Sequence, residues 1–255
     1  MRLWLSLWSL GPDLKRGDIE AVKRFGFEGI EIWAEHPQAR EHLKMAAETG
    51  LQIGMHLPFH DLNLATSDPF VAEHAVQVLT EWLYYLAEHR CQHAVLHGGY
   101  AWSVEERGTA VSRAKKTIGQ LNSIAANRNV KLLLENLAPD GLGYTHPIAS
   151  TMAEWAELLS DEDLDACLDI GHLALMGSDA ATAISTLGNR LASVHYSDND
   201  WRADLHLLPG DGKGVTEDLI DLLDSTGFKG TLVYEVNPHK YSIDDILTRI
   251  NRTTV

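Results

Sequence analysis

Cysteine is scarce in this chain of 255 residues: Cys91 and Cys167 are the only two, and they lie far apart. The sequence therefore implies no disulfide framework, which favours a reducing, cytoplasmic location. Cys167 lies inside an apolar run, where we expect it to pack as a small apolar side chain. Long apolar runs are also missing, so no membrane partner is expected, and we interpret the short, Trp-rich residues 1–8 as a strand rather than a signal peptide.

Clustered positive charge is the second absence. The chain has 21 Lys and Arg against 36 Asp and Glu, which gives a formal net charge of −15, and no run of basic residues is longer than a pair. An acidic protein repels phosphate backbones, so nucleic acid is not an expected partner. The acidic excess itself is typical of a protein that stays soluble.

Linkers, low-complexity tracts and breaks in composition are missing too, so we expect one domain over residues 1–255. Strand-like and helical segments alternate along the whole chain, and this alternation at roughly 250 residues favours an α/β fold, a single (β/α)8 TIM barrel. Long loops at 136–147 and 196–214 follow strands, where barrel sites are built. The expected strands are 3–7, 29–32, 52–56, 94–97, 131–135, 164–168, 191–195 and 230–236, and the expected helices are 14–25, 38–49, 69–88, 103–127, 150–159, 179–187, 215–225 and 243–251.

A side chain that can bind a metal ion lies at or next to the end of four of the expected strands. The carboxyl ends of parallel barrel strands meet on one face, so these side chains should converge there. Carboxylates and an imidazole are the ligand set of an open divalent-metal site. We expect one shared ion, with two of the carboxylates also acting as acid and base; the four residues are Glu135, Asp169, His195 and Glu235.

Further histidines follow strands on the same face. A single histidine is more often a hydrogen-bonded structural residue than a ligand, but several at equivalent positions favour a site. Asp204 and His206 alternate along an extended loop and so share a side, and with His172 we expect them to form a second cluster facing the first. The histidines at or just after strand ends are His56, His60, His97, His172 and His206, whereas His36, His42, His74, His89 and His93 fall on or beside expected helices and are assigned no role.

Other residues near strand ends leave two interpretations open. Glu31 is either a buried structural carboxylate or a substrate contact. Trp102 and Trp201 lie in loops of the catalytic face, where each could be a platform for stacking a sugar. The glycine-rich residues 210–214 have neither phosphate-loop nor dinucleotide spacing, so we expect a tight loop that brings the His206 segment over the metal.

Together these motifs resemble the xylose isomerase-like barrel superfamily. That superfamily includes sugar and sugar-phosphate isomerases and epimerases, and also endonuclease IV. The resemblance covers nearly the whole barrel, and it implies the (β/α)8 fold and a metal site without specifying the reaction. The matching pieces are Leu-His-Gly-Gly (96–99), Leu-Glu-Asn (134–136), Leu-Asp-Ile-Gly-His (168–172), Val-His-Tyr-Ser-Asp-Asn (194–199), Asp-Leu-His-Leu-Leu-Pro-Gly-Asp-Gly (204–212) and Tyr-Glu-Val-Asn (234–237).

Two branches of the superfamily imply different uses of the site. The ketose 3-epimerase branch implies one divalent ion, often manganese, and a carbon-bound proton exchanged by Glu135 and Glu235. It also implies substrate contacts from His172 and from the position of His206, which is an arginine in that branch. The endonuclease IV branch implies three zinc ions, but also a basic DNA-binding face that a net charge of −15 argues against. Its wider ligand set is complete in this chain: His56, His97, Glu135, Asp169, His172, His195, Asp204, His206 and Glu235.

The leading hypothesis is therefore a metal-dependent sugar or sugar-phosphate isomerase or epimerase, working by enediolate proton transfer on a small sugar or polyol. The first alternative is a zinc phosphoesterase like endonuclease IV, and the second is a non-catalytic sugar-binding barrel. The expected cofactor is one to three divalent ions, manganese or zinc, and a homo-oligomer is compatible with the sequence. Metal count discriminates between the first two hypotheses, because one ion favours the isomerase and three favour the phosphoesterase.

Overall fold

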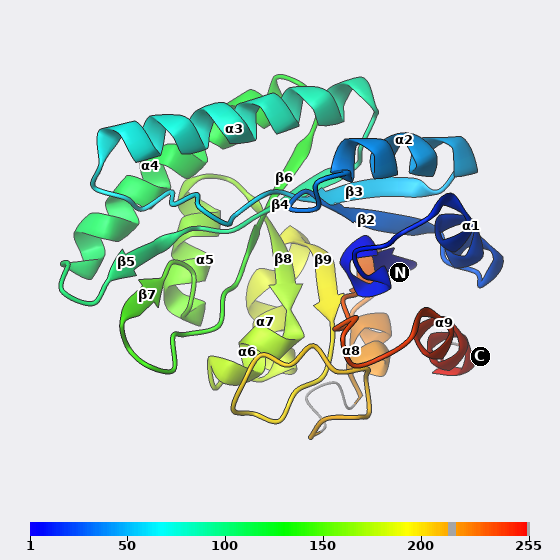
Figure 1. The fold of residues 1–255 in the computed structure, drawn as a ribbon. Helices are drawn as coiled ribbons and strands as arrows, with labels where there is room; N and C mark the ends of the chain where they lie inside the picture. The colour runs from blue at the N-terminus through cyan, green and yellow to red at the C-terminus, as the bar shows by residue number, and fades with distance from the viewer. Residues whose placement is uncertain (214–217, 254–255) are drawn as a thin grey trace.

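A closed barrel of parallel strands forms the centre of the molecule. The structure is a computed structural model and describes residues 1–213 and 218–253. Neighbouring strands follow the order β1-β10-β9-β8-β6-β4-β3-β2, so the chain winds once around the barrel and β10 closes it against β1. Among the barrel strands, Figure 1 labels β2, β3, β4, β6, β8 and β9. The barrel strands are β1 (Arg2–Ser6), β2 (Gly29–Trp33), β3 (Gln52–His56), β4 (His93–Leu96), β6 (Lys131–Glu135), β8 (Asp165–Asp169), β9 (Leu191–Tyr196) and β10 (Thr231–Tyr234).

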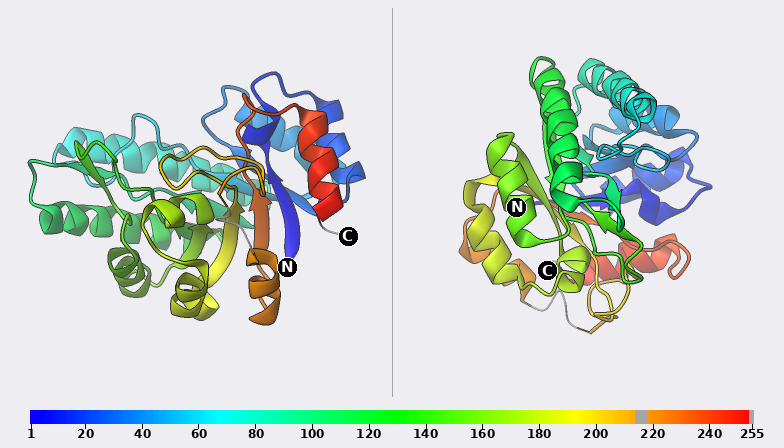
Figure 2. Two further views of the ribbon diagram at one scale, coloured as in Figure 1. Left: turned by 90° about the horizontal axis from the view of Figure 1, so that it is seen from below. Right: turned by 90° about the vertical axis from the view of Figure 1, so that its left-hand side faces the viewer.

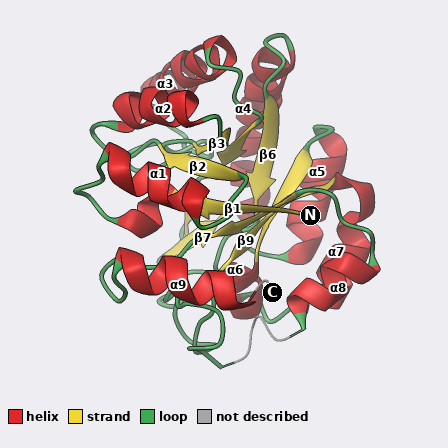
Figure 3. Ribbon diagram, turned by 90° about the vertical axis from the view of Figure 1, so that its right-hand side faces the viewer, coloured by secondary structure: helices red, strands yellow, loops and turns green. Residues whose placement is uncertain are grey.

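Helices surround this barrel on the outside (Figure 2), and colouring by secondary structure shows the strands enclosed by them (Figure 3). They are α1 (Arg16–Arg24), α2 (Ala39–Thr49), α3 (Pro69–Glu88), α4 (Arg107–Ala126), α5 (Met152–Asp161), α6 (Ile170–Leu175), α7 (Ala180–Leu187), α8 (Leu219–Ser225) and α9 (Ile243–Thr253), with short 3₁₀ helices η1 (Leu7–Leu10) and η2 (Gly188–Arg190). In the described part of the chain, no helix combines the length and apolarity needed to cross a membrane.

Helix α3 illustrates why these segments fold where they do. The Asp68 carboxylate accepts the free amides of Phe70 and Val71, and proline occupies the first helical position, where no amide is needed. Downstream, Ala75, Leu79, Leu83 and Leu86 recur at helical spacing and are all buried. The helix thus has its start fixed by polar groups and its orientation fixed by one apolar stripe.

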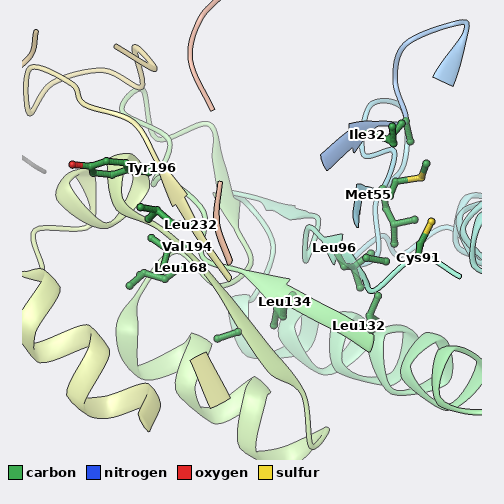
Figure 4. Packing of buried hydrophobic residues seen from close by; sticks show 14 of the residues in the cluster. Ile32, Met55, Cys91, Leu96, Leu132, Leu134, Leu168, Val194, Tyr196 and Leu232 are labelled. Carbon is green, nitrogen blue, oxygen red and sulfur yellow. The ribbon is translucent and has the colours of Figure 1, made fainter. Parts of the chain in front are cut away.

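Each barrel strand presents two different faces, because side chains alternate along a strand. On β6, Leu132 and Leu134 belong to the large apolar cluster between strands and helices, which Figure 4 shows around Met55, Leu168 and Leu232. Leu133 instead packs with Val95 and Cys167 in a separate small cluster, as the inward side chains of a barrel do. The residue two positions after Leu133 is Glu135, so the alternation turns this carboxylate into the barrel.

The expected (β/α)8 barrel is confirmed, with strands 52–56 and 131–135 at their predicted bounds. Three details differ. Two segments expected to lie in loops form an antiparallel pair, β5 (Tyr100–Trp102) with β7 (Thr145–Pro147). Helix α4 does not start at Ser103: Glu106 caps it by accepting the amides of Gly108 and Thr109. Helix α6 follows β8 directly and was not predicted. Residues 214–217, which include the start of the predicted helix 215–225, lie outside the described residues.

Candidate active site

The four predicted ligands at strand ends meet inside the barrel. Glu135 and Asp169 end β6 and β8, His195 lies near the end of β9, and Glu235 directly follows β10. Each has at least one ligand atom within 4.8 Å of those of the others, and all four residues are buried. The sequence predicted this convergence because inward positions at the carboxyl ends of parallel strands share one small volume.

The contacts around His195 suit a bound cation. Its Nδ1 atom lies 3.1 Å from Glu235 Oε2, 3.4 Å from Glu135 Oε1 and 3.9 Å from Asp169 Oδ2. Within the described residues, neither His195 Nδ1 nor Asp169 Oδ2 makes a hydrogen bond, although both are buried. Buried polar atoms are rarely unpaired, and nitrogen and oxygen atoms gathered around one space are what a divalent ion binds. The residues present therefore fit a divalent metal.

A second cluster shares Glu135 with the first. His56 Nε2 and His97 Nε2 lie 3.2 Å and 3.1 Å from Glu135 Oε2, while Oε1 of the same carboxylate faces His195. Phe59 stacks on the His97 ring at 4.3 Å between centroids and stands edge-on to His56 at 5.3 Å. Sequence reasoning missed Phe59, which lies three residues past β3 and packs against both imidazoles.

The third cluster is the one predicted from His172, Asp204 and His206. Asp204 Oδ2 lies 3.1 Å from His172 Nε2 and 3.0 Å from His206 Nε2. The opposite nitrogens donate to backbone carbonyls: His172 Nδ1 to Asn136 at 2.8 Å and His206 Nδ1 to Glu235 at 3.0 Å. These bonds aim both Nε2 atoms at the carboxylate, so the ligand atoms of this cluster also lie within 4.8 Å of one another.

Two polar side chains fix the backbone that carries these groups. The Asn136 amide donates to the Asp169 carbonyl at 2.9 Å and accepts the Asp169 amide at 2.7 Å, which ties the ends of β6 and β8 together. Asp198 pairs with Leu207 through its backbone and accepts the amides of Gly210 and Gly212. The glycine-rich segment is thus a tight loop that holds the His206 segment in place, as far as residue 213.

Charge compensation dominates the electrostatics of the site. Burial opposes ionisation of Glu135, yet the nearby His195 and His97 hold its pKa well below the usual value. Burial would lower the pKa of His206, but Asp204 raises it to about 9. Asp169 differs from both, because burial raises its pKa. Acids packed this closely require positive charge nearby, and a divalent cation would supply it.

A sequence model of one family matches residues 19–252, which is nearly all of the chain, and its description is xylose isomerase-like TIM barrel. This chain belongs to that family. Among its relatives, fructoselysine 3-epimerase of Escherichia coli O157:H7 is 21% identical over 231 residues, covering 84% of this chain and 82% of the relative.

Solved structures share the fold along the whole chain. A D-tagatose 3-epimerase-like protein superposes with a TM-score of 0.84 at 22% identity, covering 100% of this chain and 96% of the other. The 3-keto-D-glucoside 4-epimerase YcjR of E. coli superposes with a TM-score of 0.80 at 19% identity, with 99% of each chain covered. The family's barrel is therefore retained in this chain at low identity.

The predicted tryptophans have different surroundings. Trp102, which is 54% exposed, lines a cavity of about 460 Å³ together with Phe59 and His97 of the second cluster, so it borders the site. Trp201 does not line that cavity, and its Nε1 donates to the Lys213 carbonyl at 3.1 Å. His60 also stands apart from the three clusters, exposed and 3.3 Å from Glu35.

Glu31 and His93 take positions that the sequence did not settle. Glu31 is fully buried, and its Oε1 lies 3.1 Å from His195 Nε2. His93 was expected at a helix end, and that placement is wrong: it begins β4, is buried, and lies 2.9 Å from Glu31 Oε2. The preceding helix ends at Glu88, so residues 89–92 form the turn and His93 already lies within the sheet.

Proposed function

We propose that this chain is a divalent-metal-dependent epimerase or isomerase of a small sugar, sugar phosphate or polyol. The observation that carries the proposal is that two glutamates from different strands, Glu135 and Glu235, both face His195 in one buried cluster. Relatives named as sugar 3-epimerases support the same class of reaction. The expected cytoplasmic location and the absence of nucleic-acid partners stay predictions.

The metal would be manganese or zinc, held by Glu135, Asp169, His195 and Glu235. When bound, such an ion acts as a Lewis acid that polarises a substrate carbonyl and stabilises the negative charge developing beside it. The protein's own part is to position four ligands from four strands and to exclude water, since all four are buried.

The two glutamates would move the proton. One carboxylate takes the proton from the carbon next to the carbonyl, and the electron pair of that C–H bond shifts toward the carbonyl to give an enediolate. For epimerisation, the other glutamate takes up a proton from water and delivers it to the opposite face of the same carbon. For isomerisation, a proton goes instead to the neighbouring carbon, and the hydroxyl proton passes from one oxygen to the other. Interactions with His195 lower the pKa of Glu235 against the effect of burial, so Glu235 is ionised and able to accept a proton.

Deuterium exchange tests this proposal. The chain, freed of metal and reloaded with Mn²⁺ or Zn²⁺, is incubated in D₂O with free and phosphorylated ketopentoses and ketohexoses, and the products are followed by NMR. We expect deuterium at a carbon beside the carbonyl and a second sugar in the mixture, with metal-free protein inactive. Metal-loaded protein that exchanges no carbon-bound proton in any of these sugars would contradict the proposal.

A second candidate is a zinc phosphoesterase like endonuclease IV, favoured by one specific observation: the described residues contain three clusters of candidate ligands, and Glu135 belongs to two of them. In that case His56, His97, His172, Asp204 and His206 would hold further zinc ions that clamp a phosphate and activate water. Elemental analysis separates the candidates, since one ion per chain supports the epimerase and three support the phosphoesterase. If His206→Ala loses one equivalent of zinc, rather than only weakening sugar binding, the phosphoesterase becomes the better proposal.

A further inference from the structure

A row of buried polar and aromatic groups leads away from His195 into the barrel. Glu31 Oε1 lies 3.1 Å from His195 Nε2, and Glu31 Oε2 accepts from His93 Nε2 at 2.9 Å. The indole of Trp4 stacks on the His93 ring, with centroids 5.1 Å apart and planes inclined by 20°. The row therefore runs from the candidate metal cluster, through a carboxylate and an imidazole, to a tryptophan.

Two glycines make room for this row. A Cβ atom on Gly29 of β2 would collide with the Trp4 indole, and a Cβ on Gly54 of β3 would collide with the rings of both His93 and Trp4. Glycine weakens a strand interior, so it is usually found there where another group approaches closely. Gly54 is also the register partner of Glu31 across β2 and β3, which places the gap beside the carboxylate.

Packing alone does not account for an ionised group in this position. Glu31 has no exposed surface, and burying a carboxylate costs free energy that a paired partner only partly offsets. Another part of the barrel interior is filled by Val95, Leu133 and Cys167, so apolar side chains serve equally well for packing inside the barrel. The contact with His195 offers a reason for the carboxylate, because metal-binding imidazoles commonly present their other nitrogen to an acid.

We propose that Glu31, supported by His93, is a positioning residue that holds the His195 ring with Nδ1 directed at the metal cluster. This role rests on the proposed function, since it concerns the metal that the cluster would hold. Glu31 Oε1 and His195 Nε2 are buried, lie 3.1 Å apart as an ion pair and have no hydrogen-bond partner among the described residues, so each is the charged group available to orient the other.

Metal affinity and the spectrum of bound Co²⁺ test this role without any assay of activity. The full chain is stripped of metal, and Co²⁺ binding is followed by its visible absorption and by competition with a chelator. For Glu31→Gln we expect affinity to fall about 10- to 100-fold, with a changed Co²⁺ spectrum. For His93→Gln we expect a smaller loss of Co²⁺ affinity and a smaller change in the spectrum. Ile30→Val is the matched control, because it removes one methylene from the same strand on the helix-facing side and should change neither.

The outcomes separate the two proposals. Unchanged Co²⁺ affinity and spectrum in folded Glu31→Gln would overturn the positioning role while leaving the proposed function standing. If Glu31→Gln does not fold, unchanged values in His93→Gln would overturn it instead. A parent chain that binds no Co²⁺, Zn²⁺ or Mn²⁺ would contradict the proposed function before any substitution is made, and the positioning role would fall with it.

Discussion

Two histidines in different regions of this molecule, both largely shielded from solvent, have pKa values shifted in opposite directions. His206, at the carboxyl end of the barrel, has Asp204 beside it and its pKa is raised to about 9 against the effect of burial. His42, on α2 outside the barrel, has His36 as its neighbour at 4.4 Å between centroids, and burial lowers its pKa to about 4. Burial expels the proton from one ring, while a carboxylate keeps it on the other. At the barrel end, carboxylates thus stabilise the charged form of nearby imidazoles, whereas the neighbour of His42 is another imidazole, which does not.

Removing one acid from the barrel end should have the largest effect. Glu235→Gln keeps the shape of the side chain but removes an ionised ligand and a proton acceptor. We expect kcat/KM to fall by about 10²- to 10⁴-fold, with bound metal reduced and the circular dichroism spectrum unchanged. A variant that keeps both its metal and its activity would show that this carboxylate is not part of the cluster's chemistry.

Asp204→Asn tests the comparison directly, because it removes the carboxylate that raises the His206 pKa. In metal-free protein, we expect the His206 pKa to fall from about 9 to below the ordinary value of about 6.5, as it does for His42. NMR titration of the imidazole protons measures this shift. Asp163→Asn, an exposed carboxylate that pairs with Arg190, is the control and should leave His206 unchanged. A His206 pKa that stays near 9 in Asp204→Asn would assign the shift to other acids.

His42, in the outer layer of the molecule, should make the stability of the fold depend on pH. Its pKa is about 4 in the folded chain and about 6.5 when unfolded, so between these values the unfolded state binds the extra proton. This contribution to stability is complete above about pH 6.5 and is lost as the pH falls toward 4. We expect His42→Phe to reduce the loss of melting temperature between about pH 7 and pH 4.5 by a few degrees, whereas exposed His74→Gln should not. Equal pH slopes in parent and His42→Phe would refute this.

The smallest expected effect concerns DNA. Acidic side chains outnumber basic ones over the whole chain, so we expect no mobility shift of duplex DNA at physiological salt, with or without an abasic site. Incision at the abasic site would raise the phosphoesterase above the epimerase, whatever the net charge of −15 predicts.

The convergence of the four candidate ligands could be predicted from the sequence for a simple reason. Alternation along a strand is a local property, so Leu133 and Glu135 on β6 had to share the inward side once the strand was recognised. The same holds for Cys167 and Asp169 on β8. Parallel pairing then brings the ends of all such strands to one face, and no knowledge of the register is needed to predict that the four candidate ligands converge.

The sequence was less informative where the end of a helix or strand, or the pairing of two segments, depends on distant residues. Glu106 could be either the cap or the third residue of a helix, and only the observed hydrogen bonds distinguish the two. The short segments β5 and β7 become strands because each pairs with the other across a long stretch of chain, and neither has the length to be recognised alone. His93 closely follows a helical pattern, and that pattern did not show where the sheet begins.

The barrel and the four inward candidate ligands follow from the sequence alone, because the hydrophobic period and the strand order are local properties of the chain. The tertiary structure decided how these groups are connected: that Glu135 faces His195 with one oxygen and His56 and His97 with the other, and that Glu31 lies against the back of the His195 ring. Such contacts join strands far apart in sequence at distances of about 3 Å, and they depend on register, twist and rotamer together, which no local pattern contains.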